Sequence, residues 1–358
     1  MMRATFDERP AGSPAPGRIL IVSAAEGLGD GIILLPFLRR LREAAPGAHI
    51  VHAVSGPSSL AGPLRRFCAG LIDEILTGLA FFPGFWPSLA ALRRLPAADL
   101  AFLLMTRWTW VAAARATLPV GRIVNELPGY AWSDGKPLPP RRRPARKWMR
   151  TLRLVEAAFG VPVSPPAQPL LEPLADARAW ALQTLPPGAR YAGLYLGVRP
   201  DRRALPVLSG VELARELAAR GMVPVVLVGP RELASLGELK AALPQARFPG
   251  AEDGSFPDLE RVLGLAGRLE LAVVKDGGLS HALAGAGTPL LSLVIRLRPW
   301  WNVEPSSPEK WLPFGGDVRM LWLGRDARRA TASTVIPALD DLLAASSVVA
   351  RREGLARS

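Results

Sequence analysis

Short hydrophobic runs alternate along the chain with longer segments in which apolar residues recur at helical spacing. Residues 19–23 (ILIVS) form a β-rich run, and the apolar residues of the segment 32–46 that follows fall on one face of a helix. The runs 49–54 (HIVHAV) and 98–105 (ADLAFLLM) predict two more buried strands. Strands that alternate with helices in this way are typical of an α/β fold with a parallel sheet.

A second series of the same kind follows a proline-rich stretch, which we interpret as an interdomain connection that contains one short helix. The pattern predicts strands at 191–196, 223–228, 271–275 and 289–294, helices at 210–220, 257–266 and 280–286, and a terminal helix near 330–350. The predicted organisation is a disordered tail at 1–17, an N-terminal Rossmann-like domain at 18–160, a linker at 161–187, a C-terminal Rossmann-like domain at 188–329, and a C-terminal helix and tail at 330–358.

The composition of the 358 residues narrows the class of protein. Hydrophobic residues make up 49% and charged residues 21%, which is typical of globular rather than disordered chains. The single cysteine, Cys68, excludes an intrachain disulfide and a cysteine-based metal cluster, and the three histidines are too scattered in sequence for a zinc motif. We therefore expect a reducing compartment and chemistry that needs neither a metal nor a cofactor.

The net charge of +13 favours polyanionic partners, whether nucleic acid, an anionic membrane surface or a phosphorylated substrate. The sequence has no zinc-finger, helix-turn-helix or RNP motif, so nucleic acid is the least favoured of the three. The longest uncharged stretch, 75–92, contains Pro83, Gly84 and Pro87 and does not predict a membrane-spanning helix. Because the first residues also lack the apolar core of a signal peptide, we expect a cytoplasmic protein that is soluble or peripheral to the inner membrane surface.

The strand 19–23 runs into a glycine turn, GLGDG at 27–31, that opens onto a helix. Such a turn leaves free backbone N–H groups at the helix start, where an anion can bind. The spacing departs from the dinucleotide fingerprint, and Asp30 occupies the N–H groups that a pyrophosphate would need, so NAD binding is disfavoured. The helix start favours the ionised form of Asp30, which makes it a candidate general base; a simple N-cap is the alternative.

A second glycine turn, DGGLSH, begins at Asp276 and is better suited to phosphate. Gly277 and Gly278 allow the backbone to approach a ligand closely, and the N–H groups at the helix start point toward it. Ser280 adds a hydroxyl donor and His281 an imidazole, although a single histidine in a helix is more often structural. Asp276 is a candidate hydrogen-bond acceptor for the ligand or a cap of the turn.

Three segments together resemble the ADP-heptose:lipopolysaccharide heptosyltransferases of glycosyltransferase family 9. The segment LGDG-x4-P at 28–36 is similar to the opening of that family, YLGVRPDRRALP at 195–206 to its lysine-bearing loop, and DGGLSHALAGAGTPLLSLV at 276–294 to its donor motif. The resemblance covers most of the chain, from residue 18 to about residue 315.

This resemblance implies a GT-B fold, in which two Rossmann-like domains with parallel sheets face a central cleft. The N-terminal domain then binds the acceptor and the C-terminal domain binds the nucleotide sugar. The resemblance also implies metal-independent transfer with inversion, with Asp30 as the base. It implies that Arg203 stands where the family has a lysine that contacts the donor phosphates, and that Glu232 holds the ribose.

The donor motif departs from the family pattern at three places, one of which is Lys275, directly before Asp276. Gly277 replaces a serine or threonine, so one hydroxyl contact with the donor is lost. His281 is followed by Ala-Leu where the family has Leu-Ala. The identity of the transferred sugar is therefore open.

Residues that bind the acceptor are expected in the N-terminal domain. We assign Gly29, Arg107 and Trp108 to the acceptor, with core packing as the alternative for the tryptophan. The basic segment 141–153 (RRRPARKWMRTLR) suits the phosphates of a lipid-linked glycan or an anionic leaflet, or else is a solvated loop and helix face. The aromatic cluster 80–86 (AFFPGFW) is either packed or in contact with a membrane interface.

The sequence thus predicts a glycosyltransferase that moves heptose or another hexose-like sugar from a nucleotide-diphosphate donor. The expected acceptor is a phosphorylated or lipid-linked cell-envelope glycan such as the lipopolysaccharide core. Two alternatives stay open: a nucleotide-sugar epimerase, and a catalytically silent glycan- or nucleotide-binding protein of the same fold.

Overall fold

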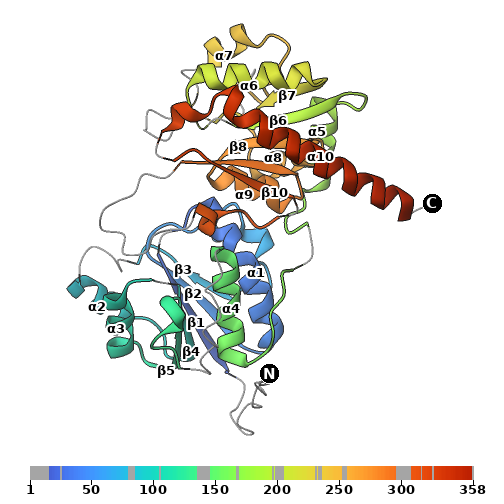
Figure 1. Cartoon of the computed structure of the whole chain (residues 1–358). Helices are drawn as coiled ribbons and strands as arrows, with labels where there is room; N and C mark the ends of the chain where they lie inside the picture. Colours follow the sequence, from blue (N-terminus) through green and yellow to red (C-terminus); the bar gives the residue numbers. More distant parts are fainter. Residues whose placement is uncertain are drawn as a thin grey trace, which may run out of the picture. The chain divides into compact units, whose positions relative to one another are not determined.

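The computed structural model divides into two compact units, Met1–Pro166 and Ala167–Ser358, and each is built on a five-stranded parallel sheet (Figure 1). The residues that the structure describes are 16–24, 26–79, 85–104, 106–134, 146–166, 169–195, 197, 205–229, 232, 236–251, 256–295, 308–315, 317–324 and 326–356. The division between the units falls inside the stretch 161–187, and most of the predicted tail 1–17 lies outside the described residues.

The first unit alternates strands and helices around a central β1. Its elements are β1 (Arg18–Ser23), α1 (Leu28–Ala44), β2 (His49–Val54), η1 (Arg65–Phe67), β3 (Glu74–Leu76), α2 (Phe85–Arg93), β4 (Ala98–Leu103), α3 (Trp108–Thr117), β5 (Val120–Asn125), η2 (Pro128–Tyr130) and α4 (Lys147–Phe159). The strand order is β3-β2-β1-β4-β5, and Ile19 of β1 lies beside Ile50 of β2 and Leu100 of β4.

Helices cover both faces of this sheet, as a parallel sheet requires (Figure 1). On one face Phe37 of α1 packs edge to face against Phe102 of β4, with ring centroids 5.2 Å apart. On the other face Trp110 of α3 shares a buried cluster with Leu20 and Val22 of β1. The hydrophobic runs of β1 and β4 are continuous because alternate side chains fill the two cores.

The second unit repeats this plan. Its elements are α5 (Ala175–Thr184), β6 (Arg190–Tyr195), α6 (Val207–Ala219), β7 (Met222–Val226), α7 (Leu236–Ala242), α8 (Leu259–Ala266), β8 (Leu271–Lys275), α9 (Gly278–Gly285), β9 (Leu290–Val294), η4 (Pro308–Trp311), β10 (Val318–Trp322), η5 (Ala327–Arg329) and α10 (Ala332–Ala356). The strand order is β10-β9-β8-β6-β7. Leu339 and Leu342 of α10 share a buried cluster with Leu213 of α6, so the terminal helix belongs to this unit.

Helix α5 comes from the proline-rich stretch and also packs into the second unit, against α8. The two helices approach closely at Gly264, where a Cβ atom would lie only 2.4 Å from the carbonyl oxygen of Ala177. Gly264 therefore allows a contact that a larger residue would prevent.

The predicted fold class, α/β with two Rossmann-like units and parallel sheets, is confirmed. The sequence located β1, β2, β4 and β6 to β9 to within two residues at either end. It did not predict the edge strands β3, β5 and β10. None of the described helices combines the length and the apolar character that a bilayer crossing needs.

Candidate functional site

The topology of each sheet marks one place where a ligand is expected. In the first unit the strand order reverses between β1 and β4, and in the second between β6 and β8. Open parallel sheets bind ligands at the carboxyl ends of the strands that flank such a reversal. The turn with Asp30 follows β1, and the turn with Arg107 and Trp108 follows β4. The turn that begins at Asp276 follows β8.

Asp30 lies in the first turn of α1, which begins four residues before the predicted helix, at Leu28. Its Oδ2 atom accepts a hydrogen bond from the N–H of Gly27 at 3.3 Å. Among the described residues no group donates a hydrogen bond to Oδ1, and the side chain is half-buried. The carboxylate therefore caps its own helix with one oxygen and keeps the other for a ligand, so the cap and base interpretations are compatible. Gly29 lies in the same helical turn.

The turn with Asp30 is fastened to the segment that follows β2. The carboxylate of Glu26 accepts a hydrogen bond from the hydroxyl of Ser58. The hydroxyl of Ser59 donates to the carbonyl of Gly27 at 3.1 Å. Because Gly27 is the N-cap of α1, these bonds fix the start of the helix that carries Asp30.

A buried polar cluster of Ser23, Glu26 and His52 lies at the base of this turn. Nε2 of His52 is 2.8 Å from Oγ of Ser23 and 4.0 Å from Oε2 of Glu26. Burial lowers the pKa of His52 to about 3, so the imidazole is neutral at physiological pH. Burial raises the pKa of Glu26, and the nearby charge of Asp30 raises it further, while hydrogen bonds and the Lys147 charge oppose this rise. Neither Glu26 nor His52 was predicted as a site residue from the sequence.

The raised pKa of Glu26 predicts a pH-dependent stability difference for Glu26→Gln. The amide oxygen still accepts from Ser58, but the side chain no longer ionises. In the wild type the folded protein disfavours the Glu26 carboxylate, so the free energy of unfolding falls as pH rises from 4.5, the ordinary value, through the folded pKa. Each unit of pKa difference is worth about 1.4 kcal/mol. Urea unfolding should therefore show that Glu26→Gln is more stabilising, or less destabilising, at pH 7.5 than at pH 4. An equal difference at both pH values would contradict the raised pKa.

The turn after β8 forms an open cradle at the start of α9. The N–H of Asp276 donates to the carbonyl of Leu293 at 3.0 Å, which joins the turn to β9. A Cβ atom on Gly277 would lie no closer than 4.0 Å to the surrounding heavy atoms, so there is space above the helix start. Gly277 is the N-cap of α9 and Gly278 its first residue. The two glycines leave room for an anion at the backbone N–H groups of the helix start.

Ser280 and His281 lie on the buried side of this helix start. The hydroxyl of Ser280 donates to the carbonyl of Gly277 at 2.6 Å, and the N–H of Gly277 is 3.3 Å from the same hydroxyl. His281 is 4% exposed. Ser280 thus shapes the cradle by closing the first turn of α9. The contacts of Ser280 and His281 with the nucleotide sugar stay predictions.

Lys275, the last residue of β8, brings a cation to the point where the strand order reverses. A Cβ atom on Gly197, just after β6, would lie 3.0 Å from Cδ and 3.3 Å from Nζ of Lys275. Gly197 has a φ of 57°, a conformation that favours glycine, and its missing side chain gives the lysine its path across the end of β6. In the sequence, Lys275 stands out only as a departure from the family motif.

Glu232 follows β7, the neighbour of β6 on the other side. It is 5% exposed, and its Oε2 atom accepts a hydrogen bond from the N–H of Gly229 at 2.9 Å. Glu232 and Lys275 therefore flank the carboxyl end of β6 within one unit. Arg203, which the sequence assigns to the donor phosphates, lies outside the described residues.

The remaining predicted contacts have different environments. Arg107 is exposed and Trp108 is 45% exposed, so core packing applies to Trp110 and not to Trp108. Residues 146–153 of the basic segment belong to the start of α4 and its N-cap, and none of them is exposed; 141–145 lie outside the described residues. The aromatic cluster lies outside them too, apart from the backbone of its last two residues.

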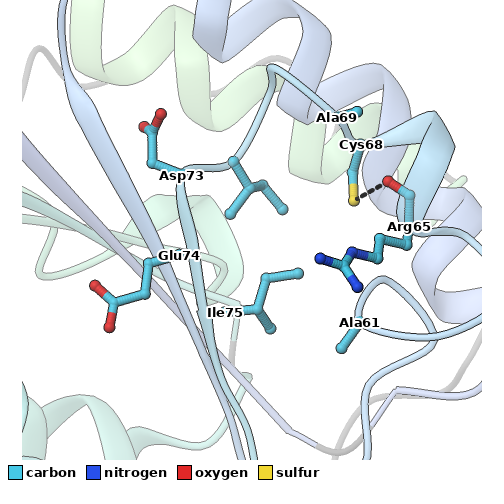
Figure 2. Close-up of a pocket in the computed structure, with 8 residues that line it drawn as sticks. Ala61, Arg65, Cys68, Ala69, Asp73, Glu74 and Ile75 are labelled. Atoms are coloured by element: carbon cyan, nitrogen blue, oxygen red, sulfur yellow. Dashed lines mark hydrogen bonds between the residues drawn. The ribbon is translucent and has the colours of Figure 1, made fainter.

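The first unit also has a hollow that is not lined by the turn with Asp30. It has a volume of 490 Å³ and lies between η1 and the start of β3 (Figure 2). Arg65 points into it, whereas Asp73 and Glu74 point away (Figure 2). Burial raises the pKa of the neighbouring Cys68 thiol. This hollow contains none of the residues that the sequence assigned to a site.

Two units, each built on a parallel sheet with this strand order, define the double-Rossmann fold of GT-B glycosyltransferases. No protein-family profile and no curated protein matches the sequence. Solved structures match the fold over nearly the whole chain. A family 9 glycosyl transferase from Veillonella parvula has a TM-score of 0.60 at 17% identity, covering 91% of this chain and 97% of that one.

Two structures from E. coli are similar to the same extent. ADP-heptose lipopolysaccharide heptosyltransferase II has a TM-score of 0.58 at 18% identity, with 92% of this chain and 99% of that chain covered. Heptosyltransferase WaaC with ADP-2-deoxy-2-fluoro heptose has a TM-score of 0.57 at 18% identity, with 90% and 99% covered. The resemblance that the sequence motifs indicate is thus confirmed at the level of the fold.

Proposed function

We propose that the protein is a glycosyltransferase that moves a sugar from a nucleotide-diphosphate donor to a hydroxyl group of a cell-envelope glycan, with inversion and without a metal. The observation that carries this proposal is the difference between the two turns at the strand-order reversals. The first offers a carboxylate oxygen with no hydrogen-bond donor among the described residues, and the second offers an open helix start beside a lysine. A base and a phosphate cradle are the two parts that such a transfer needs.

In the proposed reaction Asp30 accepts the proton of the acceptor hydroxyl while the oxygen of that hydroxyl attacks the anomeric carbon of the donor sugar. The bond from that carbon to the donor phosphate oxygen breaks, and the nucleoside diphosphate leaves with the bonding electrons. Backbone N–H groups at Gly277 and Gly278, with the cations of Lys275 and Arg203, stabilise the charge that develops on the phosphate. Glu232 holds the ribose, Asp276 accepts a hydrogen bond from the donor, and Ser280 and His281 support the cradle.

One similar E. coli protein is named for ADP-heptose and lipopolysaccharide, and the other is a heptosyltransferase with an ADP-heptose analogue. We extend this substrate class to the present chain as a proposal. A heptose or hexose-like sugar is the expected cargo, and a phosphorylated or lipid-linked glycan is the expected acceptor. The net charge of +13 supports an anionic acceptor and contact with the inner membrane surface.

Calorimetry with a panel of nucleotides and nucleotide sugars tests the donor site. We expect one nucleoside diphosphate to bind and its sugar conjugate to be hydrolysed slowly when no acceptor is present. Lys275→Met should lower the affinity for the nucleoside diphosphate about tenfold and leave the affinity for the nucleoside unchanged, because the cation acts only on phosphate. Lys275→Arg is the matched control that keeps the charge.

The same panel separates the alternatives. Binding of a nucleotide sugar without any cleavage would favour a silent module. Conversion of the sugar with its nucleotide bond intact would favour an epimerase. Failure of every nucleotide to bind would overturn the donor site.

A further inference from the structure

The first unit carries an exposed aromatic pair that the chemistry proposed at Asp30 does not use. Trp108 at the start of α3 and Trp132 after η2 contact each other edge to face, with ring centroids 4.7 Å apart. They are 45% and 51% exposed. Because an edge-to-face contact covers at most one ring face, indole surface stays open to a ligand.

A surface recess with a volume of 370 Å³ lies beside Trp132. It is lined by Ala112, Arg115, Trp132, Ser133 and Asp134. Trp108, Ala112 and Arg115 follow one another at i, i+4 and i+7, so they share one face of α3. Ala112 and Arg115 thus line the recess from the same face of α3 that carries Trp108.

Trp132 is held at this recess in an unfavourable backbone conformation. Its φ is 60° and that of Tyr130 is 57°, both in the left-handed region that bulky side chains avoid. Such conformations persist only where the surrounding structure fixes them, and they concentrate at functional sites. The strained turn thus points to a functional role for the side chain of Trp132.

Buried and charged groups fix this turn. The amide of Asn125, which is fully buried, donates to the carbonyl of Ala131 at 2.9 Å. The guanidinium of Arg115 donates to the carbonyl of Trp132 at 2.7 Å and pairs with both oxygens of Asp134, at 2.7 and 3.1 Å. Three of the five N–H donors of Arg115 are used in this way, which leaves donors for a ligand.

We propose that this recess is a saccharide subsite, in which a sugar ring of the acceptor glycan stacks on Trp132 and its hydroxyl groups bond to Arg115 and Asp134. A sugar ring has an apolar C–H face and a polar rim, which matches an indole face beside a charged pair. A protein partner would need a much larger continuous surface. The proposal rests on the glycosyltransferase function proposed above, because that function supplies the glycan.

The position of the recess suits a glycan that reaches Asp30. Asp30 follows β1, whereas Trp108 follows β4 and Trp132 follows β5, the next two strands of the same sheet. Trp132 contacts Trp108, which follows β4, and the chain then returns alongside β5, where the N–H of Asp134 donates to the carbonyl of Ile123 at 2.6 Å. A sugar bound there is a neighbour of the reacting unit rather than the reacting unit itself.

Calorimetric titration with delipidated lipopolysaccharide core oligosaccharide, cellotetraose and chitotetraose tests the subsite. We expect at least one of these oligosaccharides to bind the full-length wild type. Trp132→Ala should lower its affinity about tenfold or more. Trp132→Gly suits the left-handed backbone and provides a second variant in which the fold is retained. Trp322→Ala removes a tryptophan that is 44% exposed in the second unit and is the matched control, with no expected loss.

Nucleotide binding and donor hydrolysis, measured on the same variants, keep this test separate from that of the donor site. Trp132-dependent oligosaccharide binding supports the subsite even where donor hydrolysis fails and the proposed function falls. Absence of binding to the wild type at millimolar oligosaccharide, or equal affinity in the Trp132 variants, overturns the subsite and leaves donor hydrolysis untouched. A Trp132-dependent dimer without oligosaccharide binding would also overturn it, in favour of an interface between two copies.

Discussion

Replacing Asp30 by asparagine should lower sugar transfer by roughly 10²- to 10⁴-fold, the usual contribution of a general base. The asparagine side chain has nearly the same shape, and its carbonyl oxygen can still accept the hydrogen bond from Gly27 that caps α1. It cannot take a proton from the acceptor hydroxyl. The loss should therefore appear in kcat for transfer, while calorimetry should give a nucleotide affinity close to that of the wild type.

A second capping carboxylate in the chain provides the control. Asp258 is the N-cap of α8, where its side chain accepts a hydrogen bond from the N–H of Arg261 at 2.9 Å. Asp258→Asn changes the charge of a helix cap but not a proposed base, so transfer should be almost unaffected. Equal losses of transfer and nucleotide binding in Asp30→Asn would show that Asp30 has a structural role only. Unchanged transfer would remove it from the reaction.

The sequence was sufficient to predict those parts of the fold in which burial is uniform. The central strands are buried on both faces, so they read as continuous hydrophobic runs such as ILIVS in β1. The edge strands β3, β5 and β10 are more exposed. In β5 the first three residues are exposed or half-exposed, and in β10 no residue is fully buried. Exposed and half-buried positions interrupt the hydrophobic run, which is why β3, β5 and β10 were missed. The edge strand β7 is buried at four of its five positions and was predicted.

The candidate site was predictable where its residues are local and not where they meet through the fold. The turns with Asp30 and Asp276 follow from a strand, glycines and a helix in sequence. Glu26 and His52 are 26 residues apart, and only the parallel pairing of β1 with β2 brings them together. The exposure of Trp108 depends on where α3 begins. The left-handed backbone of Trp132 cannot be predicted from the sequence, because tryptophan rarely adopts this conformation.

Gly264→Ala should destabilise the second unit by about 1–3 kcal/mol or more, as overpacking of a tight contact usually does. The new methyl group would lie 2.4 Å from the carbonyl oxygen of Ala177 and 2.9 Å from its carbonyl carbon. These are backbone atoms of α5, so no side-chain rotation relieves the contact and the two helices must separate. Nucleotide affinity should fall with the stability of this unit, while oligosaccharide binding by the first unit should not. Thermal unfolding followed by circular dichroism, with and without nucleotide, measures the loss.

A glycine in an open position of α7 makes the result interpretable. A Cβ atom on Gly237 meets no atom within 4 Å, so Gly237→Ala should be neutral or should stabilise by up to about 1 kcal/mol, the ordinary gain from alanine in a helix. The two substitutions are chemically identical and should have opposite signs because only Gly264 faces another helix. A stable Gly264→Ala variant would mean that α5 does not pack on α8 and that residues 167–187 act as the flexible connection their prolines suggest. A destabilised variant would place α5 in the structural core of the nucleotide unit, and the connection between the units would then be confined to the residues before it.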